Sequence, residues 1–171
     1  MALCSFLVTR LPFIRALLLL LALGLPLAAP AQPIAVQNLA VLVDADGSET
    51  IDSVSAPQAA QRFTTLGGSL NAGYTRKVHW LRFSVQAPAS GSRWLEVMPP
   101  MLDDLRLFEP GNANFAERRA GDHLPFASRE EEYRGFIFKL ALADSAPHTF
   151  YLRLQTTSAS LVTLQLWQPE R

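Results

Sequence analysis

The chain has 171 residues, of which 15 are basic and 15 are acidic, so its formal net charge is zero. Two basic residues, Arg10 and Arg15, lie in the first thirty-one residues together with no acid, so the remainder carries a net charge of −2. A general nucleic-acid binder has a basic surplus, and this balance argues against that class. The single cysteine, Cys4, also lies in this first stretch, which leaves the rest without a thiol for disulfides, metal binding or nucleophilic catalysis.

The first thirty-one residues have the pattern of a secretory signal peptide. Arg10 and Arg15 form a positive start, Ala16–Leu27 is an apolar run rich in leucine, and the A-P-A sequence at 29–31 supplies the small residues of a cleavage site. An uncleaved membrane anchor is the alternative, but the apolar run is shorter than the roughly 20 residues that a span needs. We therefore expect cleavage before Gln32 and a periplasmic domain over residues 32–171 without a membrane span.

The next segments are predicted to be short strands and turns. Leu39–Val43 is an apolar strand, Asp44–Ser48 has turn chemistry, and Thr50–Val54 is predicted to pair back as a second short strand. The D-A-D-G sequence resembles the start of a calcium loop. Position 55 holds serine where that loop needs glutamate, so the pattern favours a turn over a metal site.

Only one helix is predicted. It covers Ala56–Phe63, with Ser55 as its cap and Pro57 in its first turn. The glycine-rich segment Gly67–Gly73 is predicted to be a loop. It is not a phosphate cradle, because no Lys-Ser/Thr pair follows it.

From residue 77 onward, alternating sequence indicates strand after strand. The clearest is Lys77–Val85, which places Leu81 and Phe83 on one side and Trp80 and Arg82 on the other. Similar alternation predicts further strands at Ser92–Met98, Asp103–Phe108, Phe115–Arg119, Tyr133–Leu142, Thr149–Gln155 and Leu161–Trp167. Many short strands, with proline and glycine turns between them and almost no helix, predict an all-β fold, an antiparallel β-sandwich.

The side chains opposite the apolar faces form an outward set. Its members are Trp80, Arg82, Trp94, Glu96, Arg106, Lys139, Tyr151, Arg153, Gln165 and Trp167. If several of their strands share one sheet, one face carries rings, cations and amides, a pattern typical of a sugar or polyol site, and the same set would bind a carboxylate through bidentate arginine. The structural alternative is that the rings form cross-strand pairs, while the arginines pair with acids or lie across rings.

A loop with a second candidate site follows at Gly121–Arg129. The sequence Leu124–Phe126 is expected to tuck this loop onto the core, which leaves Asp122 and Arg129 to contact a ligand. The alternative is that Asp122 and Arg129 pair with each other and only hold the shape of the loop.

The sequence does not have the pattern of an enzyme. Its three histidines, His79, His123 and His148, have no metal-ligand spacing, and no H-E-x-x-H or G-x-S-x-G motif occurs. Glu130–Glu132 could supply paired carboxylates for glycoside hydrolysis, but a solvated charged turn is favoured. We expect no catalysis, no metal and no cofactor.

The order of several motifs resembles a known family. They are W-L-R-F at Trp80–Phe83, R-W-L-E-V-x-P-P-x-L-D-D-L-R-L-F at Arg93–Phe108, G-D-x-L-P-F-x-x-R at Gly121–Arg129, Y-L-R-L-Q at Tyr151–Gln155 and L-x-L-W at Leu164–Trp167. This order resembles the second type of extracellular sensor domain in bacterial seven-transmembrane receptors with diverse intracellular signalling modules. The resemblance implies a jelly-roll sandwich related to carbohydrate-binding modules, a periplasmic location and signalling to a cytoplasmic module.

In receptors of this kind the domain continues into seven membrane helices, whereas this sequence ends at Arg171. We expect either a truncated receptor or a free-standing periplasmic domain. The predicted function is binding and sensing of a small carbohydrate-like or carboxylate ligand through Trp80, Arg82, Trp94, Glu96, Asp122, Arg129, Tyr151 and Arg153. The alternative is a non-catalytic module that docks a receptor partner or a second copy of itself in the periplasm.

Overall fold

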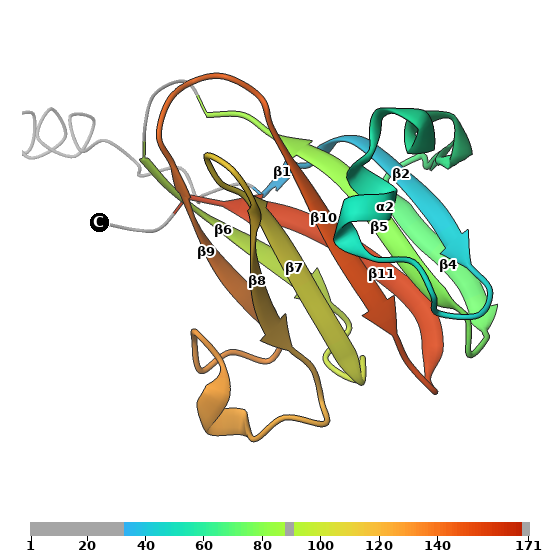
Figure 1. Ribbon diagram of the computed structural model, residues 1–171. Coiled ribbons are helices and arrows are strands. Elements are labelled where there is room, and N and C mark those ends of the chain that lie inside the picture. Colours follow the sequence, from blue (N-terminus) through green and yellow to red (C-terminus); the bar gives the residue numbers. More distant parts are fainter. Residues whose placement is uncertain (1–32, 88–90, 169–171) are drawn as a thin grey trace, which may run out of the picture. The chain divides into compact units, whose positions relative to one another are not determined.

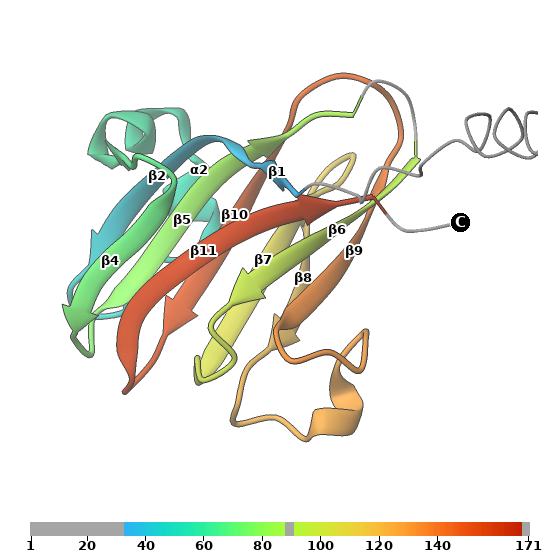
Figure 2. The same cartoon turned by 180° about the vertical axis from the view of Figure 1, so that it is seen from behind.

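A computed structural model describes residues 33–87 and 91–168. The predicted signal peptide and its cleavage site lie outside the described residues. Within the described part, the chain folds into two antiparallel sheets that face each other (Figures 1 and 2). This arrangement confirms the predicted all-β sandwich.

The six-stranded sheet has the order β3-β2-β5-β10-β7-β8. Its strands are β2 (Gln37–Asp44), β3 (Thr64–Thr65), β5 (Val78–Val85), β7 (Asp104–Pro110), β8 (Phe115–Ala120) and β10 (His148–Gln155). The predicted central strand is therefore β5, which pairs with β2 on one side and β10 on the other.

The five-stranded sheet has the order β1-β11-β6-β9, and β4 also pairs with β11. Its strands are β1 (Ile34–Ala35), β4 (Ser69–Tyr74), β6 (Gly91–Met98), β9 (Phe136–Leu142) and β11 (Ala159–Trp167). Figure 2 has this sheet in front, with β6 beside β11.

The main core lies between the two sheets and consists of the predicted inward faces. Leu81 and Phe83 of β5 are fully buried, as are the inward side chains of β6, β9, β10 and β11. Phe83 stacks on Phe150 of the neighbouring strand, with ring centroids 5.8 Å apart. Period-two alternation places these apolar side chains on one surface of each sheet, and their burial away from water holds the sheets together.

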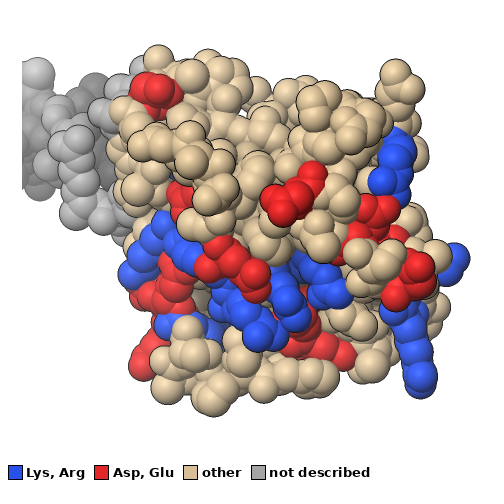
Figure 3. Space-filling model, in the orientation of Figure 1, with Lys and Arg blue, Asp and Glu red and all other residues tan. Residues whose placement is uncertain are grey.

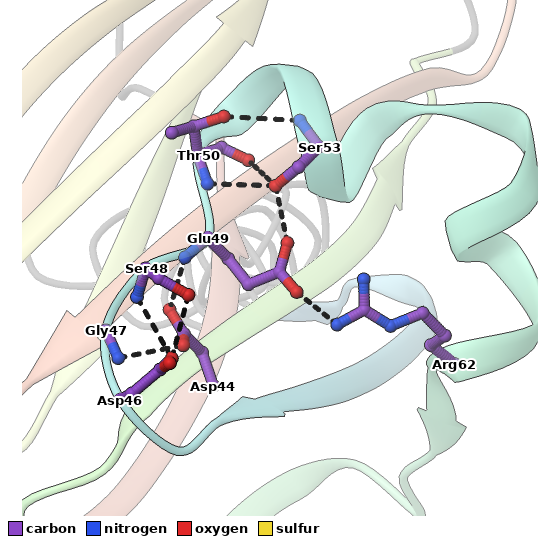
Figure 4. Close-up of polar contacts among 8 residues, drawn as sticks. All are labelled: Asp44, Asp46, Gly47, Ser48, Glu49, Thr50, Ser53 and Arg62. Carbon is purple, nitrogen blue, oxygen red and sulfur yellow. Dashed lines mark hydrogen bonds and ion pairs between the residues drawn. The ribbon is translucent and has the colours of Figure 1, made fainter.

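The turn after β2 has the predicted chemistry. The Asp44 carboxylate accepts hydrogen bonds from the backbone N–H of Gly47, at 2.9 Å, and of Glu49, at 3.1 Å (Figure 4). Asp46 accepts a hydrogen bond from the Ser48 hydroxyl at 2.8 Å. The acidic side chains therefore close the turn by binding its own backbone, the usual role of aspartate at such positions.

The predicted strand Thr50–Val54 is wrong, because this segment is helical. Helix α2 (Ile51–Ser55) begins with a capping box, in which Thr50 and Ser53 each accept a hydrogen bond from the other's backbone N–H (Figure 4). The 3-10 helix η1 (Pro57–Arg62) follows and occupies the position of the predicted helix. Its N-cap is Ala56 without a side-chain hydrogen bond, so the predicted Ser55 cap is also wrong.

Two further boundaries differ from the sequence-based expectation. Ser69–Tyr74, predicted to be part of a loop, is strand β4 and pairs with β11. Strand β9 starts at Phe136 and not at Tyr133, because the carbonyls of residues 133–135 accept hydrogen bonds from the guanidinium of Arg129. A third short helix, η2 (Phe126–Ser128), lies in the loop before it.

Candidate functional site

The outer face of the six-stranded sheet brings together half of the predicted site residues. Arg153 of β10 is in register with Trp80 of β5 and with Arg106 of β7, and Tyr151 is in register with Arg82. Opposed residues of an antiparallel pair point to the same side of a sheet. These five side chains therefore share one face, which is turned to the viewer in Figure 1.

The aromatic part of this face is closed. Trp80 is 1% exposed and Tyr151 is 6% exposed, and both pack in a second small core with Val54 of α2. Trp80 stacks on Phe108 of β7, with centroids 5.4 Å apart and an angle of 29° between the planes. The prediction of open rings on this face is therefore wrong for Trp80 and Tyr151. Helix α2 covers an outer face that sequence alternation alone leaves open.

The open part of the face is a network of guanidinium groups around one carboxylate. Asp104 of β7 accepts hydrogen bonds from Arg106 and from Arg119 of β8, each at 3.0 Å, and from Arg153 at 3.4 Å. Arg106 also lies 3.8 Å from a carboxylate oxygen of Glu117. Figure 3 shows basic side chains gathered across the middle of this face, with acidic ones between them.

This network shifts the pKa values of two of its members, Asp104 and Arg153. Burial alone would raise the pKa of Asp104, but the hydrogen bonds and charges of Arg119 and Arg106 outweigh burial and hold that pKa below its ordinary value. Burial lowers the pKa of Arg153, and the neighbouring Arg106 charge lowers it further. The face is therefore a site where positive charges are crowded and an anion is stabilised.

Arg82 completes the cationic side of this face. Its guanidinium carbon lies 4.5 Å from the centroid of the Phe63 ring, a cation–π contact that confirms one of the predicted alternatives. Among residues 33–87 and 91–168, no acidic side chain forms an ion pair with Arg82. Burial raises the pKa of the adjacent Tyr151, and the Arg82 charge partly opposes that effect. The Phe63 ring thus positions the Arg82 guanidinium without neutralising its charge.

Trp94 and Glu96 lie elsewhere, on the outer face of the five-stranded sheet. Glu96 is 5% exposed and accepts a hydrogen bond from Nε1 of Trp167 at 2.7 Å. The Lys139 ammonium lies 5.5 Å from the Trp94 ring centroid. The predicted outward set is therefore divided between two faces, because β6, β9 and β11 belong to the opposite sheet.

The loop residues have different surroundings again. Arg129 lies between two rings, 4.8 Å from the centroid of Phe126 and 4.7 Å from that of Phe136. Asp122 is exposed, and its backbone N–H donates to the carbonyl of Leu102 at 2.8 Å. The predicted alternative of an Asp122–Arg129 pair is wrong, since Arg129 donates to backbone carbonyls instead. Arg129 therefore stabilises the conformation of its own loop.

Sequence reasoning missed three residues of the network. Asp104, Glu117 and Arg119 lie on the outer face because β7 and β8 pair with Arg106 opposite Arg119 and Phe108 opposite Glu117. The alternation of L-R-L at 105–107 does place Asp104 beside Arg106 on one face. The pairing with β8 was the missing information. No cluster of three metal-ligating side chains occurs within the described residues.

Comparison with known proteins identifies the family. The family model described as "7TMR-DISM extracellular 2" matches residues 36–168. A solved structure, the GH31 alpha-xylosidase from Xanthomonas citri, is similar over 82% of this chain and 16% of the enzyme, with 11% identity and a TM-score of 0.42. The chain thus spans about a sixth of the length of that enzyme.

No curated protein sequence matches this chain. Within the described ranges, no helix combines the length and the apolar character needed to cross a membrane. The match over residues 36–168 covers every strand of both sheets except β1, and it includes the arginine-lined face. The chain belongs to the 7TMR-DISM extracellular 2 family, the extracellular part of seven-transmembrane receptors.

Proposed function

We propose that this domain is a non-catalytic, periplasmic ligand-sensing module of a bacterial receptor. It binds a small molecule, carbohydrate-like or carboxylate-bearing, on the outer face of the six-stranded sheet. The observation that carries this proposal is the set of four arginines, from β5, β7, β8 and β10, held in place on that face by one acid and one ring. Side chains on strands are better fixed than side chains on loops, which suits a recognition site.

The hydrogen bonds of Asp104 on this face favour binding over catalysis. A general acid or base needs a free proton-transfer position near the substrate, whereas Asp104 already accepts hydrogen bonds from three guanidinium groups. His79 is buried, and burial lowers its pKa, which favours its neutral form. These features support a binding role for the face.

Of the two ligand classes, the carboxylate is the better fit. Stacking of a sugar requires an open ring, and Trp80 and Tyr151 are both buried. Trp80 packs with α2 in the second core, and Tyr151 contacts the rings of Phe63 and Phe115. Guanidinium groups, by contrast, form paired hydrogen bonds with carboxylate oxygens, and this geometry is specific. The partly exposed side chains of Arg106 and Arg119 could make such contacts.

The test is a binding screen of the purified full chain against small carboxylates and monosaccharides, followed by thermal unfolding and calorimetry. A saturable ligand should stabilise the protein, and Arg82→Gln should weaken its binding at least about tenfold. Arg93→Gln is the matched control, because Arg93 lies on β6 and, among residues 33–87 and 91–168, its side chain donates to the carbonyl of Ser92 alone. Binding that both variants leave unchanged would place the site elsewhere and refute the proposal.

A second candidate function is docking of a second copy through the outer face of the five-stranded sheet. Leu161 is 42% exposed there, and the half-buried Trp94 and Trp167 are in register on the same face. Aromatic and apolar groups of this kind are enriched in interfaces. Sedimentation of the full chain would then show a dimer that Leu161→Asp dissociates, while a monomer at high concentration would rule this function out.

A further inference from the structure

Three arginines, which we call the arginine row, lie side by side across three neighbouring strands. Arg153 of β10 is the Cα partner of Arg106 of β7, which is in turn the Cα partner of Arg119 of β8. Like charges directly opposite each other destabilise a sheet. A single carboxylate, that of Asp104, contacts all three guanidinium groups and relieves this repulsion only in part.

Most hydrogen-bond donors of the arginine row are unused. Each guanidinium has five N–H groups. Side-chain hydrogen bonds within the described residues use one donor of Arg106, one of Arg119 and two of Arg153. The side chains of Arg106 and Arg119 are 33% and 52% exposed, so both are partly open to solvent.

The other acids near the row neutralise it only in part. Glu117 reaches Arg106 only at 3.8 Å. The Asp44 charge also acts on Arg153, but within the described residues its carboxylate accepts hydrogen bonds from the backbone N–H groups of Gly47 and Glu49 and none from the arginine row. Arg82 adds a fourth cation on the same face. The donors that remain open are therefore charged and lack acceptors of their own.

We propose that the arginine row is a binding site for small polycarboxylate anions, and this inference rests on the proposed sensing function. Neighbouring strands lie about 4.8 Å apart, so adjacent guanidinium groups start from backbone positions that suit two carboxylates on a short carbon chain. Each carboxylate accepts N–H groups from the solvent-facing side of Arg106 and its neighbours. Asp104 contacts the same guanidinium groups and would compete with such a ligand for their charge.

The test is calorimetric titration of the full chain at low ionic strength, with citrate, inorganic phosphate and xylitol as probes. Citrate should bind saturably, and its binding should weaken as salt is added, because exposed charges are screened. Arg106→Gln should weaken citrate binding at least about tenfold. Asp104→Asn, which removes the competing charge, should tighten it by about threefold or more.

Control variants separate binding from folding. Arg119→Gln is a milder variant than Arg106→Gln, because Arg119 is more exposed and, within the described residues, pairs with Asp104 alone, whereas Arg106 also pairs with Glu117. It too should weaken citrate binding. Arg93→Gln on the opposite sheet should leave citrate binding unchanged. Circular dichroism and the unfolding midpoint of each variant identify any variant that fails to fold.

Each other result has a definite meaning. Absence of citrate binding, or citrate binding that ignores Arg106→Gln, Arg119→Gln and Asp104→Asn, overturns the inference. Phosphate binding as tight as citrate binding overturns the assignment to polycarboxylates. Xylitol binding that Arg82→Gln removes, without citrate binding, overturns the inference but leaves the proposed sensing function intact.

Discussion

Replacing Trp80 with alanine should strongly destabilise the domain. Trp80 is 1% exposed and packs against Phe108 of β7 and Val54 of α2. A tryptophan buries about 150–250 Å², and at about 25 cal/mol per Å² of apolar surface this gives about 4–6 kcal/mol. Measured losses for Trp→Ala in protein cores are about 3–5 kcal/mol, so we expect a loss within that range.

Two variants serve as comparisons. Trp94→Ala, on the opposite sheet, removes a ring that is only half-buried, so it should cost less than half as much. Trp80→Phe keeps a ring and removes Nε1, which is buried without a hydrogen-bond partner. Losing an unsatisfied donor offsets part of the lost packing, so this variant should cost about 1–2 kcal/mol.

The assay is urea denaturation of the full chain, followed by circular dichroism. When the slope of unfolding free energy against urea concentration is the same for two variants, a shift of the urea midpoint reports a change in stability. A loss below about 1.5 kcal/mol for Trp80→Ala, or a loss equal to that of Trp94→Ala, would refute the reasoning, because α2 would then not seal a second core. A loss as large as predicted also means that ligand screens cannot use Trp80→Ala as a clean binding variant.

Three further predictions concern the turns and the arginine network. Gly121→Ala should cost at least about 2 kcal/mol in the same urea assay, because φ is +144° and the added Cβ would lie 2.1 Å from the Asp103 carbonyl oxygen. Gly67→Ala is the control and should have little effect, because the space around Gly67 is open. Thr50→Ala should lower the free energy of unfolding by about 1 kcal/mol, since it removes the capping box of α2. An unchanged unfolding midpoint would mean that packing alone holds this helix. The pKa of Asp104 is lower in the folded protein than its ordinary value of 3.8, so its stabilising contribution is full above that pH and is lost as the pH falls through the folded pKa. The stability difference between the parent protein and Asp104→Asn should therefore shrink below about pH 4, and a difference that stays constant there would contradict this assignment.

Local sequence was a good guide wherever one strand face meets the main core. Phe83, Leu152 and Leu154 alternate with polar neighbours, and all are buried between the sheets as predicted. The segment at 50–54 was misassigned because its apolar residues fit either a short strand or a single helical turn. The reciprocal hydrogen bonds of Thr50 and Ser53 decided for the helix, and they are visible only in the fold.

The candidate site was predictable in part. Alternation correctly placed Arg82, Arg106 and Arg153 away from the core. It could not assign Trp94 to the opposite sheet, because the sheet to which a strand belongs depends on partners that are distant in sequence. It also could not foresee that α2 covers Trp80, since burial of an outward face depends on what else packs there.

The amino-acid sequence by itself determined the all-β class, the inward faces of the strands and the family, because each depends on local alternation or on the order of motifs. Only the tertiary structure decided which outward side chains meet. The strand order β10-β7-β8 places three arginines around one aspartate, and the position of α2 converts exposed rings into a second core. The physical reason is that hydrogen-bonded strand pairing acts between residues far apart in the chain, where local pattern carries no information.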